Sequence, residues 1–360
     1  MNISVNTAML AKKLKLVEKI VAQKSILPIM SNVLLRAEMN ELKLSTTNME
    51  VSLTTACPVV VNAPGVITAP VKPLLDIVSQ ITEEQTHLMV EKNHVRVAAG
   101  AFKMRLQTLA PEDFPQLPQM PEGGMLIPGD LFKMMIKRVR YAISDADKRY
   151  FMNGALLSMT ENLIALVATD GKRLALTATK RTAPGASVDI VIPTKTLDVL
   201  LSDESHEDIM FAKDIRQMFF VSDDNVLTSR TIDGNFPNYK RIIPSANNCI
   251  AQIPRTALLS ALKRVSLAAA DTRSLTFTLD ENSLSLSSAN AQVGDAIEHL
   301  PIVYTGPAFK IAYEWNFVMD FLNAAASPSV KLALKDAGTA SLWSDGEGAE
   351  FMNVIMQMRT

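Results

Sequence analysis

The sequence has few of the side chains that metal sites and disulfide frameworks require. Among 360 residues there are only two cysteines, Cys57 and Cys249, and four histidines. The histidines are scattered and none forms an HExxH motif or another metal-ligand pair. Two cysteines cannot build a disulfide framework or a cysteine-rich zinc site. We therefore expect neither a metal nor any other cofactor.

Long apolar runs and nucleotide-binding motifs are also absent. No run approaches the roughly 18 apolar residues that a membrane span needs. The opening segment MNISVNTAMLAKKLKL lacks a signal-peptide core, which favours a cytoplasmic protein. Neither GxxxxGK[ST] nor a strand–GxGxxG–helix pattern occurs, so no phosphate-cradling loop is expected.

A catalytic constellation is missing as well. The acidic pairs Glu83-Glu84 and Asp223-Asp224 lie beside expected turns, where they keep the chain solvated. Asp170-Gly171 and Asp233-Gly234 are turn dipeptides rather than catalytic carboxylates. No nucleophile stands next to a base, and the sequence therefore favours a protein that is not an enzyme.

The composition is that of a folded protein with more than one domain. Hydrophobic residues make up 48% and charged residues 20%, a balance typical of soluble globular chains. A chain of 360 residues is too long for one ordinary core. We expect two or three domains.

An internal repeat favours three domains. Asp76, inside an apolar run, recurs 122 residues later as Asp198 and after another 122 residues as Asp320. Three further landmarks recur at nearly the same period: 44–48 with 166–170 and 286–290, Phe114-Pro115 with Phe236-Pro237, and Ile127-Pro128 with Ile253-Pro254. A period of about 120 residues exceeds that of solenoid repeats and indicates three tandem domains.

Turn-forming segments divide the repeats. Residues 116–125 and 244–248 are rich in proline, glycine, serine and asparagine. We predict a first domain at 1–120, a second at 121–246 and a third at 247–360.

Each repeat should be α+β. Segments 7–24, 129–143 and 255–270 carry apolar residues at helical spacing and are predicted to be helices. The predicted buried stripes are Leu10, Leu14 and Val17; Phe132, Ile136 and Val139; and Leu258, Leu262 and Val265. A second helix carries the recurring aspartate, and most of the rest alternates as antiparallel strands do.

The positive charge is concentrated in the three leading helices. The net charge of the chain is −1, but the 49 residues of these helices carry a balance of +10 and the remainder −11. One basic helix is most simply a solvated surface. Three copies against an acidic background favour a surface for a polyanion such as DNA, with Lys137, Arg138, Lys263 and Arg264 as contacts.

The C-terminus is unusually apolar, reading FMNVIMQMRT. It is either a last strand that completes a sheet or, because methionine is adaptable, part of a groove for partners.

Three long motifs resemble a known family. They are SILPIMSNVLL at 25–35, VATDGKRLA at 167–175 and DGNFPNY at 233–239. In this order they resemble the bacterial DNA sliding clamp, the beta subunit of replicative DNA polymerase III. That family's fold is three similar domains per chain, and two chains close head-to-tail into a ring. Helices line the hole and antiparallel sheets form the outside.

The resemblance implies a function without chemistry. Such a clamp encircles double-stranded DNA and tethers the polymerase III catalytic subunit for processive synthesis. Further implied partners are a second copy of the chain, the clamp loader, and other polymerases and repair proteins that insert short linear peptides.

The resemblance also implies three sets of residues. Further DNA contacts are implied at Lys24, Arg149, Tyr150 and Phe151. The partner pocket is implied at Met152, Thr169, Gly171, Lys172, Arg173, Leu174, Pro237, Arg241, Ile242, Val354, Ile355, Met356 and Met358, with Arg173 and Arg241 as cationic rims. The dimer seam is implied at Met104, Leu106, Leu267, Ala268 and Ala269.

This chain departs from the family pattern at three of the pocket and tail positions. Lys172 replaces a histidine, Gln357 a proline and Thr360 a leucine. These departures also allow a divergent second clamp with altered partner or inhibitor binding. The sequence leaves two other interpretations open: a polyanion-binding scaffold that never closes into a ring, and an enzyme on a tripled scaffold.

Overall fold

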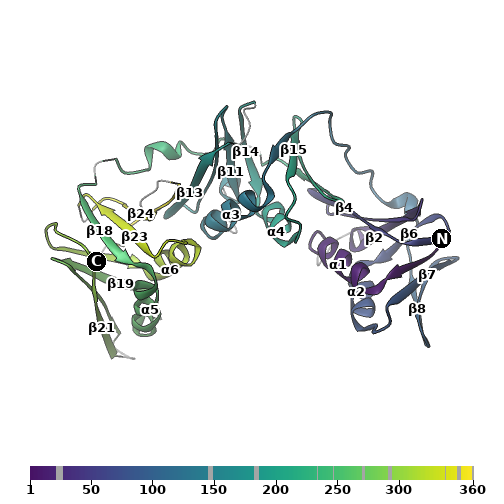
Figure 1. Ribbon diagram of the computed structural model, residues 1–360, viewed down its shortest axis with the longest axis horizontal. Coiled ribbons are helices and arrows are strands. Elements are labelled where there is room, and N and C mark those ends of the chain that lie inside the picture. The colour runs from purple at the N-terminus through teal and green to yellow at the C-terminus, as the bar shows by residue number, and fades with distance from the viewer. Residues whose placement is uncertain are drawn as a thin grey trace. The chain divides into compact units, whose positions relative to one another are not determined.

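The chain forms two compact units, each built from two stretches of sequence. The computed structural model describes residues 1–21, 27–144, 149–181, 186–232, 234–245, 247–269, 272–290, 294–336, 338–346 and 350–358 (Figure 1). The first unit comprises Met1–Lys133 and Lys195–Thr231, and the second comprises Met134–Thr194 and Ile232–Thr360.

The first unit holds two antiparallel sheets. The five-stranded sheet has the order β5 (Val60–Ala63), β1 (Asn2–Asn6), β7 (Gln85–Glu91), β8 (His94–Ala99), β9 (Phe102–Gln107). The eight-stranded sheet has the order β10 (Met125–Ile127), β15 (Ile209–Lys213), β16 (Gln217–Ser222), β17 (Asn225–Arg230), β4 (Val51–Pro58), β3 (Glu41–Thr47), β2 (Asn32–Glu38), β6 (Gly65–Pro70). Helices α1 (Thr7–Glu18) and α2 (Val71–Gln80) pack on each other, and α1 also packs on β3 and β4 (Figure 1).

The second unit repeats this plan. Its eight-stranded sheet has the order β14 (Val188–Pro193), β11 (Gly154–Met159), β12 (Leu163–Thr169), β13 (Arg173–Lys180), β25 (Phe351–Ile355), β24 (Ser341–Asp345), β23 (Ser329–Leu334), β18 (Cys249–Pro254). Its four-stranded sheet has the order β21 (Gly294–Pro301), β20 (Ser283–Asn290), β19 (Ser274–Asp280), β22 (Phe309–Glu314). Helices α5 (Arg255–Val265) and α6 (Trp315–Ala324) pack on each other.

The order of elements confirms the internal repeat. A short strand leads into α1, α3 (Gly129–Val139) or α5, several strands follow, then α2, α4 (Thr194–Ser202) or α6, and three strands close the repeat. The first repeat differs by one added strand, β5. Each repeat therefore has two helices and many antiparallel strands, as the sequence predicts.

Two repeats share each eight-stranded sheet. In the first unit β17 pairs with β4, with Val226 opposite Thr54. In the second unit β13 pairs with β25, with Leu174 opposite Val354. Backbone hydrogen bonds thus cross the expected domain seams, which is why the compact units do not coincide with single repeats.

The buried helix stripes are as predicted, but the predicted helix ends are wrong. Leu14, Ile136 and Leu262 are fully buried. Helix α1 ends at Glu18, where Ile20 N–H donates to the Val17 carbonyl and tightens the last turn. Likewise α3 and α5 end at Val139 and Val265, and short 3₁₀ turns over Arg140–Ala142 and Ser266–Ala269 replace their predicted ends.

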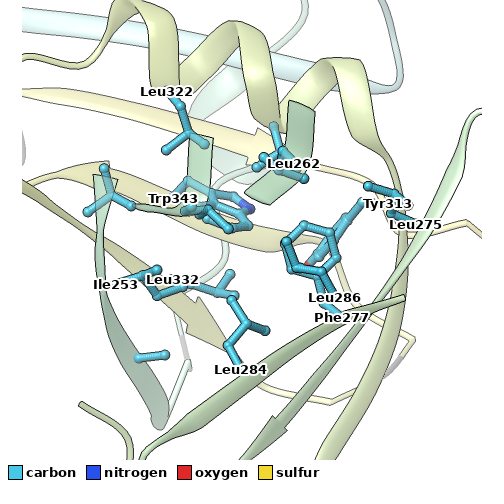
Figure 2. Packing of buried hydrophobic residues seen from close by; sticks show 14 of the residues in the cluster. Ile253, Leu262, Leu275, Phe277, Leu284, Leu286, Tyr313, Leu322, Leu332 and Trp343 are labelled. Carbon is cyan, nitrogen blue, oxygen red and sulfur yellow. The ribbon is translucent and has the colours of Figure 1, made fainter. Parts of the chain in front are cut away.

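Trp343 lies at the centre of the third repeat's core (Figure 2). Its ring is fully buried and lies edge-on to Phe277 and Tyr313, with centroids 6.3 and 6.0 Å away. Its indole Nε1 donates to the Ser341 hydroxyl at 3.1 Å, so the buried polar group is satisfied. This core holds α5 and α6 against the sheet that contains β13 and β25.

Candidate peptide pocket and nucleic-acid surface

An apolar pocket opens at one end of the β13–β25 ladder in the second unit. Its volume is about 210 Å³. The lining comes from four segments far apart in sequence: Arg149, Phe151 and Met152; Thr169, Gly171, Lys172, Arg173 and Leu174; Pro237 and Ile242; Val354 and Met356. Ten of the thirteen predicted pocket residues are brought together here.

The floor of the pocket continues an apolar cluster on one face of the sheet. Leu174 and Val354 are opposite each other in the ladder and almost fully buried. They pack with Leu156, Val167 and Val191, and the segment that contains Phe236 and Tyr239 covers this cluster. Ile242 is 42% exposed at the pocket, so an incoming apolar group would find both a buried floor and a reachable wall.

A tightly hydrogen-bonded turn forms one wall. The Asp170 carboxylate accepts from the backbone N–H groups of Lys172 and Arg173, both at 2.9 Å. The Thr169 hydroxyl accepts from Gly171 N–H at 3.1 Å and donates to the Arg173 carbonyl at 2.7 Å. Gly171 has φ +88°, where a side chain is strained, and a Cβ there would lie 3.2 Å from the Arg149 guanidinium.

The structure corrects the predicted role of Arg173. Its side chain is 9% exposed, and its Nε donates to Asp170 at 3.0 Å. The two Nη atoms donate to Asp320 at 2.6 Å and to the Tyr141 carbonyl at 2.5 Å. The guanidinium is therefore taken up by internal partners and cannot serve as a cationic rim for peptide carbonyls.

Three predicted pocket residues lie outside the lining. Arg241 is exposed in the 3₁₀ turn Tyr239–Arg241, and Ile355 is fully buried opposite Arg173. Met358 is half-buried, and its N–H donates to the Ala312 carbonyl at 2.8 Å. The tail thus completes a sheet through β25, which confirms that interpretation of the C-terminus. Met356 of the tail also lines the pocket.

Two departures from the family pattern have visible partners. Lys172 lies 3.8 Å from the Glu314 carboxylate, with most of its own side chain in solvent. The Gln357 amide donates to the carbonyls of Asp336 and Thr339 at 3.3 and 2.7 Å. Gln357 therefore anchors the tail by hydrogen bonds that proline could not make. Thr360 lies outside the described residues, as does Lys24.

Arg149 and Phe151, predicted from the resemblance as DNA contacts, line the pocket. Phe151 lies edge-on to Phe236, with ring centroids 6.4 Å apart. Tyr150 between them is 73% exposed. The sequence signal for this placement is the position of Arg149 and Phe151 directly before Met152, itself a predicted pocket residue.

The basic helix residues divide into exposed and engaged groups. Lys137 and Lys263 are exposed, and neither has an ion-pair partner among the described residues. Arg264 is 60% exposed and forms a two-point ion pair with Glu298. This hydrogen-bonded pairing holds the pKa of Glu298 below its usual value. Arg138 is 15% exposed, packed on Phe351 and paired with Asp345.

Several lysines near the second-repeat loops are also paired. Lys12 contacts Glu204 at 2.8 Å, Lys13 contacts Asp224 at 3.9 Å, and Lys19 donates to the Ser202 hydroxyl at 2.6 Å. The hydrogen bond from Lys12 holds the pKa of Glu204 below its usual value. The Lys12–Glu204 pair is solvent-exposed, so salt screens it and it contributes little stability. The charge balance of the helices thus overstates the free positive charge.

The predicted seam residues differ in accessibility. Met104 on β9 is 42% exposed and Leu267 is 74% exposed, whereas Leu106, Ala268 and Ala269 are buried in their own chain. β9 and β21 each form one edge of their sheet. Ile297 on β21, which sequence reasoning missed, is 62% exposed.

The described residues contain no group of three or more metal-ligating side chains. Among the same residues, no helix is both long and apolar enough to cross a membrane.

Comparisons with known proteins cover the whole chain. Family models match three consecutive stretches: the DNA polymerase III beta subunit N-terminal domain over residues 1–118, the central domain over 126–238 and the C-terminal domain over 240–359. The beta sliding clamp of Pseudomonas putida KT2440 is 29% identical over the full length of both chains.

Solved structures agree with these matches. The sliding clamp of Pseudomonas aeruginosa bound to griselimycin is 27% identical, with a TM-score of 0.94 and complete coverage of both chains. The sliding clamp of Bartonella birtlesii bound to griselimycin is 29% identical, again with a TM-score of 0.94 and complete coverage.

Proposed function

Since this chain belongs to the family of the DNA polymerase III beta subunit, we propose that its pocket and its exposed basic residues serve partner tethering and DNA encirclement. It has the three-domain clamp fold and is a DNA sliding clamp of replication, a processivity subunit that performs no chemistry. We assign the separate parts of this function to the pocket, to exposed lysines of the repeated helices and to two edge strands.

The pocket is the observation that supports partner tethering most strongly. A short linear peptide needs an apolar anchor site with a few polar guides, and the cavity has an apolar floor at Leu174 and Val354. Met356, 51% exposed, is a flexible wall that can adapt to different side chains. We assign this pocket to peptides from the polymerase III catalytic subunit and from other polymerases and repair proteins. Griselimycin, which is bound to two similar clamps, is a second compound to titrate against the pocket.

Replacing Met356 by aspartate tests this assignment. The carboxylate would line the cavity, and burying it under a peptide costs on the order of several kcal/mol without a paired cation. We expect titration with a short synthetic peptide from the polymerase III catalytic subunit to show a large loss of affinity. Met39→Asp is the matched control, because Met39 is 94% exposed at the β2–β3 turn. Equal affinity of both variants for the peptide would refute the pocket assignment.

We propose that DNA contacts the exposed residues Lys137, Lys263 and Tyr150. Two lysines from two repeated helices offer positive charge at equivalent positions, which suits a phosphate backbone contacted without base readout. Arg264 can contribute in part, because Glu298 offsets its charge. A ring that surrounds the duplex needs no deeper recognition, and we propose that a clamp loader opens it.

Self-association is proposed through the edge strands β9 and β21. β9 carries Lys103 beside the exposed Met104, and β21 carries Asp295 near the exposed Ile297. Opposite charges and two unlike edges suit a head-to-tail contact with a second copy, which closes a ring when two chains meet twice. Leu267 lies in the 3₁₀ turn that packs on β21, so it extends the same apolar surface.

Two finer assignments stay predictions. The domain boundaries 1–120, 121–246 and 247–360 are proposed as the limits of the three repeats. We also propose that the clamp works in the cytoplasm.

A further inference from the structure

Arg173 connects the wall of the pocket to a helix of the third repeat. Its guanidinium carbon lies 4.4 Å from the Phe317 ring centre and 5.3 Å from that of Tyr141. Asp320, one turn further along α6 than Phe317, accepts from its Nη1 at 2.6 Å. Phe317 and Asp320 belong to α6, whereas Tyr141 follows α3, so one side chain joins both elements.

The same guanidinium holds the pocket turn. Asp170 receives Arg173 Nε on one carboxylate oxygen, and its other oxygen accepts the N–H groups of Lys172 and Arg173. A continuous set of charge-assisted hydrogen bonds therefore runs from the turn through Asp170 and Arg173 to Asp320. Such bonds are about twice as strong as neutral ones, and loss of the Asp320 charge would leave the buried guanidinium with one of its two carboxylate partners, Asp170.

The internal repeat supplies a comparison for Asp320. It is the third copy of the recurring aspartate, and the first copy, Asp76, is exposed on α2. Asp76 has no ion-pair partner among the described residues. Shifting Arg173 and Asp320 back by the 122-residue period gives Val51 and Asp198, so at this period valine replaces the arginine. The third copy has thus acquired a contact that the first copy does not make.

We propose that Arg173 is a positioning residue that couples occupancy of the pocket to the packing of α6. The coupling rests on the proposed peptide binding. A peptide seated against the turn at 170–172 restrains Asp170 and Arg173, and through them Asp320. Thermodynamic coupling is reciprocal. If peptide binding strengthens the contact between Arg173 and Asp320, then weakening that contact lowers the affinity for the peptide by the same factor.

The test uses the full-length protein and the variant Asp320→Asn, which keeps the size of the side chain and removes its charge. Asp320 does not line the pocket. Its matched control is Asp76→Asn, the same change at the first copy. Two quantities are measured: the dissociation constant of the polymerase-derived peptide, and hydrogen exchange of the amides of Lys172, Arg173 and α6, with and without peptide.

We expect Asp320→Asn to raise the dissociation constant of the peptide by roughly fivefold or more, since fivefold is the lower end of typical coupling factors. Peptide should slow exchange in α6 of the wild type and no longer do so in Asp320→Asn. In the absence of peptide the variant should exchange faster at Lys172 and Arg173, whereas Asp76→Asn should match the wild type throughout. A residue that only stabilised the fold would change exchange equally with and without peptide.

Equal peptide affinity of Asp320→Asn and wild type would overturn the coupling while leaving the pocket assignment intact. Failure of the peptide to bind the wild type would instead refute the pocket assignment. In that case, amide hydrogen exchange at Lys172 and Arg173 without peptide still tests whether α6 supports the turn. An unchanged exchange rate in Asp320→Asn would show that α6 does not support it.

Discussion

The guanidinium of Arg138 lies 5.1 Å from the centre of the Phe351 ring, so the end of α3 packs against β25. The same group lies 3.7 Å from the Asp345 carboxylate and 3.5 Å from the Thr177 hydroxyl. Arg138 therefore joins α3 to β13, β24 and β25, the strands through which two repeats share one sheet. Its neighbour Lys137 is exposed and has no ion-pair partner among the described residues.

This difference predicts unlike effects of two substitutions on DNA binding. Replacing Lys137 and Lys263 together by alanine should lower the magnitude of the log–log salt slope by about 0.9 for each phosphate that is no longer neutralised. Arg138→Ala should instead lower the midpoint of thermal unfolding, because it removes the cation beside the buried Asp345 carboxylate and uncovers Phe351. The measurements are DNA titrations across salt concentrations and thermal unfolding.

An unchanged salt slope in the double lysine variant would contradict the proposed DNA surface. A reduced slope in Arg138→Ala without loss of stability would show that this arginine does face phosphate, as its place in a basic helix predicts.

The seam makes a second prediction. Ile297→Asp should convert the dimer to a monomer at low micromolar concentration, because it places a charge in an apolar contact beside Asp295 and Glu298. Ile215→Asp is the control, since Ile215 is 96% exposed in the turn between β15 and β16 and belongs to neither β9 nor β21. Light scattering over a concentration series measures the molecular mass of both variants. Identical masses for the two variants would exclude β21 from the interface.

Gly171 gives a third prediction with a close control. Gly171→Ala places a Cβ 3.2 Å from the Arg149 guanidinium at φ +88°, so the backbone of the turn is strained and the Arg149 side chain in the pocket wall must give way by a few tenths of an ångström. Gly123→Ala carries similar strain at φ +82° but meets nothing within 4 Å. Each change should cost about 1–2 kcal/mol of stability.

Only Gly171→Ala should also lower the affinity for the peptide. If both variants bound it as the wild type does, the turn at 170–172 would not be part of the binding wall.

Much of the fold could be predicted from the sequence because burial follows periodicity. Leu14, Ile136 and Leu262 recur at helical spacing in each repeat, and all three are fully buried. The helix ends could not be predicted in the same way, since the tightening of the last turn at Ile20 depends on local hydrogen bonds rather than on the apolar pattern. An apolar pattern over many residues predicts that a helix or strand exists, but it does not predict the residue at which that element ends.

The pocket could be located from the sequence, but the roles of its charged residues could not. Periodicity and resemblance place Arg173 near Leu174 and Val354, yet neither shows that Asp320, 147 residues away, takes up its charge. The charge pattern likewise groups Arg138 with the DNA contacts, because the sequence does not show that Asp345 lies beside it. A count of charges cannot separate an exposed lysine from an arginine that is paired in the interior.

A clamp holds DNA by encircling it, and this property can be measured directly. The most direct measurement loads the protein onto nicked circular DNA with a clamp loader, isolates the complex by size, and then linearises the DNA with one cut. We expect the complex to persist on the circle and to be lost from linear DNA, because a ring slides off a free end. Protein that stays bound after the cut would contradict encirclement and favour a scaffold that grips the DNA surface.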